Sequence, residues 1–193
     1  MKIVCVGDSL TAGYGVSNKT NWIYLLKESL HHDIINKGVN GDTSFGVLTR
    51  SFHDIIALNP DICIVLIGTN DLLMNRSVKN TTDNIKTLVK EIVENDILPV
   101  IAFPPKIVPS LAKEKWCETI DYQKVNNNLL ELRELLLTFC LENSYKKIDF
   151  YEAFSSISEF NSHKYYLDGI HLNAKGHEIM YNLIVKEIME CIL

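Results

Sequence analysis

A serine near the start of the chain and an aspartate–histidine pair near its end are the residues best suited to chemistry. Ser9 follows the apolar residues 3–6 within the sequence Gly-Asp-Ser-Leu, and Asp168 precedes His171 by three positions. Serine catalysis needs a hydroxyl, a base that takes its proton and an acid that orients the base. A bond from the His171 Nδ1–H to Asp168 would leave Nε2 free to act as that base. Together, the two ends favour a hydrolase.

Two polar turns between these ends offer further hydrogen-bond donors. Gly41 and Asp42 follow one apolar segment, and Asn70 follows another. The backbone amide of Gly41 and the side-chain amide of Asn70 could stabilise negative charge on a substrate oxygen, and losing one such donor typically lowers a rate by about 10²–10³. Both positions also suit ordinary turns, because Asp42 or Thr43 could cap the next helix and Asn70 alone is typical of a cap.

The other candidate residues also have structural interpretations. Ser9 alone would be an ordinary turn or cap serine, and the adjacent Asp8 is interpreted as a residue that holds the turn. Asp168 and His171 could form a surface pair or half of a metal site, but no third ligand has suitable spacing. His177 is expected to pack or cap. Structural roles are also expected for the remaining histidines, His31, His32, His53 and His163.

Short apolar segments alternate with helical patterns along the chain. A continuous apolar segment, typical of a strand buried on both faces, covers residues 3–6, and further strands are expected over residues 34–39, 62–67, 97–103 and 148–151. Apolar residues recur at steps of three and four over residues 22–30, 45–58, 84–95 and 122–141 and after Asn173. Thr81 and Thr82 are expected to cap the helix over 84–95. The alternation predicts an α/β fold of about five parallel strands with helices on both faces, in a single domain of residues 1–193.

Ligands in open α/β sheets bind beyond the carboxyl ends of the strands. Ser9 follows the first predicted strand, Gly41 the second and Asn70 the third, and Asp168 and His171 come after the fifth. All the candidate groups are therefore expected on one edge of the sheet, which is a stronger argument for a site than any single motif.

A long segment without a clear pattern, from Pro104 to Ile120, follows the fourth predicted strand. Its length is typical of a functional loop rather than a linker. Four of its side chains could line a site for an acyl group or could pack the loop down: Ile107, Val108, Leu111 and Trp116. We expect substrate selectivity to depend on this loop.

Composition excludes several classes of function. A formal charge of −5 with interleaved charges is unlike a nucleic-acid-binding surface. No segment approaches the roughly 18 apolar residues of a membrane span, and the apolar segment after Lys2 is too short for a secretory leader, so a cytoplasmic protein is expected. The five cysteines have no C-x-x-C spacing, so neither a zinc site nor a disulfide framework is expected. The oligomeric state stays open.

Four blocks, in this order, resemble the SGNH, or GDSL, hydrolase family, named for a catalytic Ser, Gly, Asn and His. The blocks are residues 7–10, Gly41 and Asp42 with Ser44, residues 68–71 and residues 168–172, and the last continues through residues 173–177. The resemblance covers essentially the whole chain. The pattern looks most like the compact bacterial lysophospholipase and arylesterase branch.

The resemblance implies a flavodoxin-like, three-layer α/β/α sandwich, the SGNH hydrolase fold. It implies Ser9 as the nucleophile, His171 as the base and Asp168 as the acid that orients it. It also implies an oxyanion hole formed by the amides of Ser9 and Gly41 and the side chain of Asn70, with no metal or organic cofactor. The implied substrate is a small-molecule acyl ester: a short-chain ester, a lysophospholipid, a thioester or an O-acetylated carbohydrate.

Two other interpretations remain open. An α/β-hydrolase shares the order Ser, Asp, His but places its serine in a G-x-S-x-G turn deep in the chain, whereas Ser9 lies near the N-terminus. A non-enzymatic flavodoxin-like module could bind a flavin or a phosphate at the same edge through Ser9 and Thr11. The pair of Asp168 and His171 favours the hydrolase.

Overall fold

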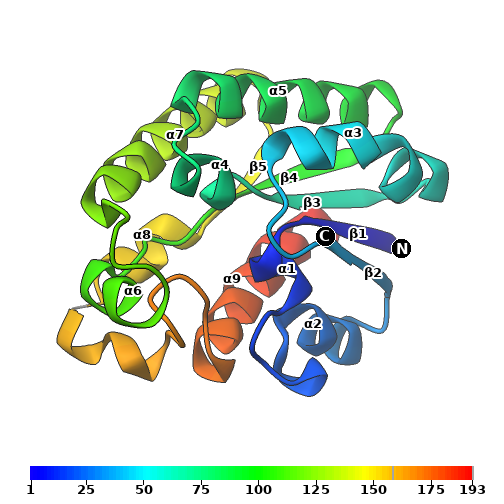
Figure 1. Cartoon of the computed structure of the whole chain (residues 1–193). Helices are drawn as coiled ribbons and strands as arrows, with labels where there is room; N and C mark the ends of the chain where they lie inside the picture. The colour runs from blue at the N-terminus through cyan, green and yellow to red at the C-terminus, as the bar shows by residue number, and fades with distance from the viewer. Residues whose placement is uncertain (158, 193) are drawn as a thin grey trace.

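The chain folds around a five-stranded parallel sheet (Figure 1). The computed structural model describes residues 1–157 and 159–192. The strands lie in the order β2-β1-β3-β4-β5, and they are β1 (Lys2–Gly7), β2 (Asp33–Gly38), β3 (Ile62–Leu66), β4 (Leu98–Phe103) and β5 (Lys146–Asp149). The chain passes from β1 to β2 on one side and then crosses to β3 on the other. The carboxyl ends of β1 and β3 therefore flank the crevice where open α/β sheets bind ligands.

Helices cover both faces of the sheet, which confirms the predicted three-layer α/β/α architecture (Figure 1). One face carries α3 (Ser44–Asp54), α5 (Val78–Glu94) and α7 (Tyr122–Asn143), and the other carries α2 (Trp22–Leu30), α8 (Phe150–Ser155) and α9 (Ala174–Ile192). Shorter helices follow several strands: α1 (Ser9–Ala12), α4 (Thr69–Leu73) and α6 (Pro109–Lys115), with 3-10 turns η1 (Asn18–Thr20), η2 (Ile56–Leu58) and η3 (Glu159–Lys164).

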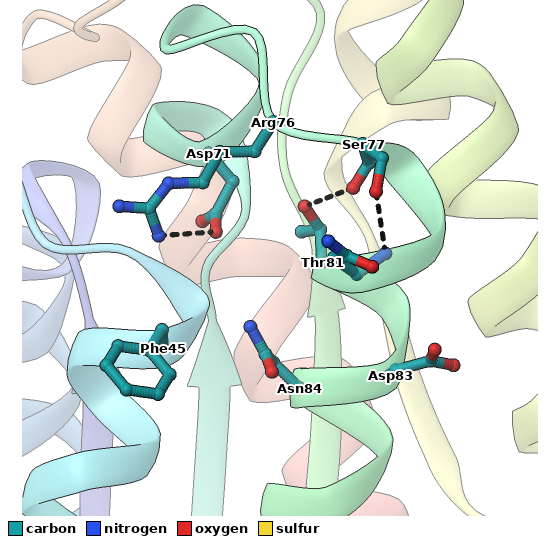
Figure 2. Close-up of a pocket in the computed structure, with 8 residues that line it drawn as sticks. Phe45, Asp71, Arg76, Ser77, Thr81, Asp83 and Asn84 are labelled. Carbon is teal, nitrogen blue, oxygen red and sulfur yellow. Dashed lines mark hydrogen bonds and ion pairs between the residues drawn. The ribbon is translucent and has the colours of Figure 1, made fainter.

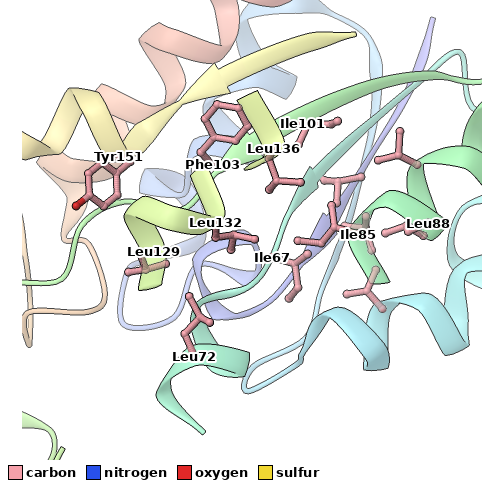
Figure 3. Packing of buried hydrophobic residues seen from close by; sticks show 14 of the residues in the cluster. Ile67, Leu72, Ile85, Leu88, Ile101, Phe103, Leu129, Leu132, Leu136 and Tyr151 are labelled. Atoms are coloured by element: carbon pink, nitrogen blue, oxygen red, sulfur yellow. The ribbon is translucent and has the colours of Figure 1, made fainter. Parts of the chain in front are cut away.

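Alternate side chains of each central strand enter different cores. In β1, Val4 and Val6 pack on the side of α5 and α7, whereas Ile3 and Cys5 pack on the side of α2 and α9. Figure 3 shows the first core, in which α5 and α7 meet β4 through Ile85, Leu88, Leu129, Leu132, Leu136, Ile101 and Phe103. Because successive strand side chains point to opposite faces and both faces are covered, residues 3–6 of β1 and all residues of β3 and β4 are apolar.

The fifth strand lies two residues earlier in the sequence than the apolar pattern predicts. Residues 148–151 are expected as a strand, but β5 ends at Asp149, and Phe150 and Tyr151 begin α8. The Asp149 carboxylate accepts a hydrogen bond from the Glu152 amide at 3.0 Å and caps this helix. Both aromatic rings are buried, so their apolar character alone does not distinguish strand from helix.

Two predicted helices have different limits in the structure. The helix expected over 84–95 begins at Val78, and Ser77 caps it by accepting the Asn80 amide at 3.1 Å. Thr81 and Thr82 are therefore not caps, and their hydroxyls donate back to the Ser77 and Val78 carbonyls. The helix expected over 45–58 ends at Asp54 and continues only as the separate turn η2.

The segment from Pro104 to Ile120 is more ordered than predicted, because it contains α6. Ile107 and Val108 are buried and Leu111 is partly buried, so three of the four apolar candidates pack the segment down. The Ile107 amide donates to the Asn126 side chain at 2.9 Å, and the Val108 amide donates to the Gly169 carbonyl at 2.8 Å. The second bond ties this segment to the turn that carries Asp168 and His171.

Two cysteines lie in the central strands β1 and β3. Cys5 and Cys63 are buried, and Cys117 is partly exposed. The Cys191 side chain lies outside the described residues. Among the helices described here, none is long and apolar enough to cross a bilayer.

Candidate active site

The turn after β1 places Ser9 at the start of α1. Asp8 caps this helix, since its Oδ1 accepts the Leu10 amide at 2.9 Å, so its interpretation as a turn-holding residue is confirmed. A side chain at Gly7 would lie 2.1 Å from the Leu66 carbonyl oxygen, which makes glycine necessary where β1 passes β3. Ser9 is consequently held on a short, rigid turn at the carboxyl end of β1.

Asp168 and His171 lie in a tight turn before α9. Asp168 Oδ1 accepts the backbone amides of Ile170 (2.9 Å) and His171 (2.7 Å), and the His171 carbonyl accepts the Leu167 amide at 2.8 Å. Gly169 adopts a φ of 88°, in the left-handed region where glycine carries no steric penalty. The turn therefore presents one carboxylate oxygen to the backbone and leaves the other to face the imidazole.

The two ends of the chain meet as predicted. Ser9 Oγ lies 2.9 Å from His171 Nε2 across 162 residues of sequence, and His171 Nδ1 lies 2.7 Å from Asp168 Oδ2. Burial alone would raise the pKa of Asp168, but the hydrogen bonds from His171 and the His171 charge lower it overall. An ionised carboxylate can only accept, so Nδ1 carries a proton and Nε2 of the neutral ring is free to accept the Ser9 proton.

A small cavity of about 90 Å³ opens beside the Ser9 hydroxyl, and Gly41 and Asn70 line it with Ser9 and His171. Gly41 has a φ of 78°, and its Cα faces open space. Within the described part of the chain, the Ser9 and Gly41 amides donate no hydrogen bond. The sheet thus brings all three predicted oxyanion donors to one cavity.

Asn70 is positioned by the ends of two other strands. It lies inside α4, whose cap is Gly68, so the cap interpretation of Asn70 is wrong. Its Nδ2 donates to the Asp42 carbonyl at 2.9 Å and lies 3.4 Å from Asp8 Oδ2. The neighbouring Asp71 is buried and accepts the Ser44 amide and hydroxyl at 2.8 and 2.7 Å. These bonds lock the turn after β2 to the turn after β3.

Two buried groups near the site have shifted pKa values. Burial raises the pKa of Asp8 to about 7, and its bond to the Leu10 amide offsets only part of that effect. Burial also lowers the pKa of His177 to about 4. His177 Nδ1 accepts the Trp22 amide at 3.4 Å at the start of α2, as expected for a packing or capping residue.

Little in the sequence indicated which residues form the apolar wall of the cavity. Tyr14, Leu73 and Ile170 line it together with Trp116, the one loop candidate that reaches the site. Gly13 and Gly15, which flank Tyr14 with φ values of 87° and 76°, were the available signal for a tight turn beside Ser9.

A larger cleft of about 390 Å³ lies between the start of α3 and the start of α5 (Figure 2). It contains none of Ser9, Asp168 and His171, and its polar groups bond one another. Arg76 pairs with Asp71, and Ser77 bonds both Asn80 and Thr81. Among the described residues, no three His, Cys, Asp or Glu side chains lie together as a metal site would require. The candidate catalytic residues therefore lie at the smaller cavity beside Ser9 and not in this cleft.

Comparison with known proteins agrees with this geometry. An arylesterase of Vibrio mimicus is 31% identical over 112 residues, which cover 54% of this chain and 56% of that protein. Esterase TesA of Pseudomonas aeruginosa is 26% identical over 94 residues, covering 46% and 47%. The chain spans about half the length of the curated relatives it matches. The lipase/acylhydrolase structure from Enterococcus faecalis superimposes with a TM-score of 0.80 at 25% identity, covering 97% of this chain and 95% of that one.

The family assignment covers more of the chain than any curated relative. The pattern of the GDSL-like Lipase/Acylhydrolase family matches residues 5–179, a range that includes Ser9, Gly41, Asn70, Asp168 and His171. Because this match extends over most of the sequence, the chain belongs to the GDSL-like lipase/acylhydrolase family.

Proposed function

We propose that the protein hydrolyses small acyl esters through an acyl-enzyme formed on Ser9. The observation that carries this proposal is the chain of contacts from Ser9 Oγ to His171 Nε2 (2.9 Å) and from His171 Nδ1 to Asp168 Oδ2 (2.7 Å). A hydroxyl, a base and an orienting carboxylate in that order are the components of serine catalysis. The family match supports the same class of reaction over a flavin- or phosphate-binding module.

The reaction follows from the positions of these groups. His171 Nε2 takes the Ser9 proton as Oγ attacks the ester carbonyl, and Asp168 stabilises the imidazolium. The negative oxygen is stabilised by the amides of Ser9 and Gly41 and by Asn70. His171 then gives the proton to the departing alcohol, and water releases the acyl group by the same route.

The size of the cavity favours a short acyl group. Its volume is about 90 Å³. Sites that enclose drug-sized ligands begin at about 300 Å³. An acetyl or similarly short group fits inside, whereas the chain of a lysophospholipid would have to lie along the outer surface. Short-chain esters and O-acetyl groups are therefore preferred to long-chain substrates.

Ser9→Ala tests the proposal on p-nitrophenyl acetate. We expect turnover to fall at least ~10³-fold, because loss of the nucleophile removes the acyl-enzyme route, with circular dichroism and thermal unfolding unchanged. Ser29→Ala is the matched control, since Ser29 lies on the exposed side of α2 and donates only to the Leu26 carbonyl. A fluorophosphonate should label the wild type and Ser29→Ala at Ser9 but should not label Ser9→Ala. Retained turnover in a folded Ser9→Ala protein would exclude Ser9 as the nucleophile.

A further inference from the structure

Two aromatic side chains stand over His171 and have no part in the proton transfers described above. Tyr14 and Trp116 are 45% and 48% exposed. Their ring centroids lie 4.4 and 5.0 Å from that of His171, and the two rings are 6.5 Å apart at an interplanar angle of 84°. The imidazole thus forms the floor of an apolar corner with two nearly perpendicular walls, and about half of each wall is open to a ligand.

The backbone on either side of Tyr14 and at Trp116 is held in place by neighbouring residues. Tyr14 lies between Gly13 and Gly15, where an added Cβ would come within 1.8 Å of the Asn21 amide nitrogen and 2.5 Å of a Leu167 methyl carbon. The Trp116 amide donates to the Ala112 carbonyl at 2.9 Å, and the Val108 bond to Gly169 anchors the same loop. The backbone positions from which the two rings project are therefore held by contacts with the surrounding turns.

The proton path decides which half of the ester reaches this corner. The carbonyl oxygen must face Gly41 and Asn70, while the leaving oxygen must lie beside His171 Nε2, which gives it a proton. The carbon skeleton of the alcohol therefore begins next to Tyr14 and Trp116. Among the described residues that line the cavity, Asp8 carries the one carboxyl group, and it is buried. The corner consequently offers ring faces and edges to an uncharged group.

Resting on the proposed hydrolysis, we propose that Tyr14 and Trp116 select esters whose alcohol carries a ring directly on the ester oxygen. The rings of Tyr14 and Trp116, which lie near a right angle, can contact one face and one edge of a six-membered ring at once. An unbranched chain cannot make both contacts. The shared chemistry is an uncharged six-membered ring, whether aromatic, as in a phenol, or saturated, as in a cyclohexanol or a sugar.

Tyr14→Leu and Trp116→Leu test this selection because they remove a ring and keep apolar bulk. Four acetate esters serve as substrates: phenyl, cyclohexyl, hexyl and ethyl acetate. The ratio of wild-type to variant kcat/KM is compared for each ester, which cancels the intrinsic reactivity of the leaving group. We expect each variant to lose roughly three- to tenfold on phenyl and cyclohexyl acetate, mainly through KM, and less than about twofold on ethyl and hexyl acetate. Phe52→Leu is the control, because Phe52 is 60% exposed on α3, packs its ring against His53 and does not line the cavity.

A binding measurement separates this proposal from the proposed hydrolysis. The protein has two tryptophans, and Trp22 is fully buried, so ligand-induced changes in tryptophan fluorescence report on Trp116. In Ser9→Ala protein, cyclohexanol should change this fluorescence at lower concentration than 1-hexanol, and Tyr14→Leu should remove that preference. Equal losses on all four esters, or equal binding of the two alcohols, would overturn the selection. Acetylcholine is assayed beside the four esters, and a loss confined to it would assign the corner to a cation and would also overturn the selection. Full activity of Ser9→Ala with the ring preference intact would refute the hydrolysis mechanism alone.

Discussion

Replacing Asp168 with asparagine tests whether this carboxylate sets the tautomer of the base. In the wild type, Oδ1 accepts the amides of Ile170 and His171 at 2.9 and 2.7 Å, and Oδ2 faces His171 Nδ1 at 2.7 Å. An asparagine that keeps its oxygen toward the two amides turns its NH₂ toward Nδ1. Nδ1 must then accept, so the ring proton moves to Nε2, which can no longer take the Ser9 proton.

The size of the effect follows from the cost of restoring the active tautomer. The asparagine side chain would have to flip, and its NH₂ would then face two backbone N–H groups. Leaving two buried donors unsatisfied costs about 1–3 kcal/mol each, or roughly 2–6 kcal/mol together. At 1.36 kcal/mol for each factor of ten, kcat should fall between about 30-fold and 10⁴-fold. KM should change little, because Asp168 does not line the cavity.

Initial rates with p-nitrophenyl acetate measure this loss, and thermal unfolding monitors the fold. Asp121→Asn is the matched control, since Asp121 caps α7 by accepting the Lys124 amide at 3.0 Å and asparagine caps helices equally well. The control should keep wild-type kcat. If a folded Asp168→Asn protein keeps kcat within about threefold of the wild type, well below the smallest expected loss, the carboxylate does not determine the tautomer.

Three further substitutions have defined outcomes. Asn70→Ala should lower kcat by about 10²–10³ with little change in KM, because it removes one oxyanion donor; an unchanged kcat would exclude this role. Asp8 has a raised pKa of about 7, so its carboxyl opposes folding increasingly as pH rises from about 4 to 7. Asp8→Asn should therefore raise the free energy of unfolding, measured with urea, by up to ~4 kcal/mol near pH 8 and by much less near pH 4. His177 has a pKa lowered to about 4, so its own contribution to stability should fall by up to ~3 kcal/mol as pH drops from about 6.5 to 4, opposite in direction to the contribution of Asp8. His177→Gln, which can still accept the Trp22 amide, should therefore gain stability relative to the wild type by up to that amount over this range, and an unchanged difference between the two proteins would contradict the burial argument.

Local patterns in the sequence were sufficient for the layered fold and for the edge that carries the site. A strand that is covered on both faces must be apolar at every position. The positions of β1, β3 and β4 could therefore be predicted from their apolar residues. Helices between parallel strands return the chain to the same end of the sheet, so polar residues after successive strands had to converge. Ser9, Gly41 and Asn70 were therefore placed together before any contact between them was known.

Other features were not determined by residue type alone. Phe150 and Tyr151 are apolar enough for a strand, but the cap at Asp149 turns them into α8. Ser77 rather than Thr81 caps α5. Thr81 lies inside the first turn, where its hydroxyl donates to the Ser77 carbonyl. Residue type also did not determine which of the four loop side chains would line the cavity: Ile107, Val108, Leu111 or Trp116.

The sequence by itself determined the sheet, its helical layers and the kinds of group that meet at its edge. Strands buried on two faces need apolar residues throughout, the helices between them need apolar residues at steps of three and four, and both patterns are visible in the sequence. Only the tertiary structure decided the 2.9 Å contact of Ser9 with His171 and the aromatic corner above it. These depend on the packing of the turns against one another, through bonds such as Val108 to Gly169 and Asn70 to Asp42. The first bond joins two backbone atoms and the second ends on a backbone carbonyl. Because every residue carries a backbone carbonyl, residue type does not reveal such partners in advance.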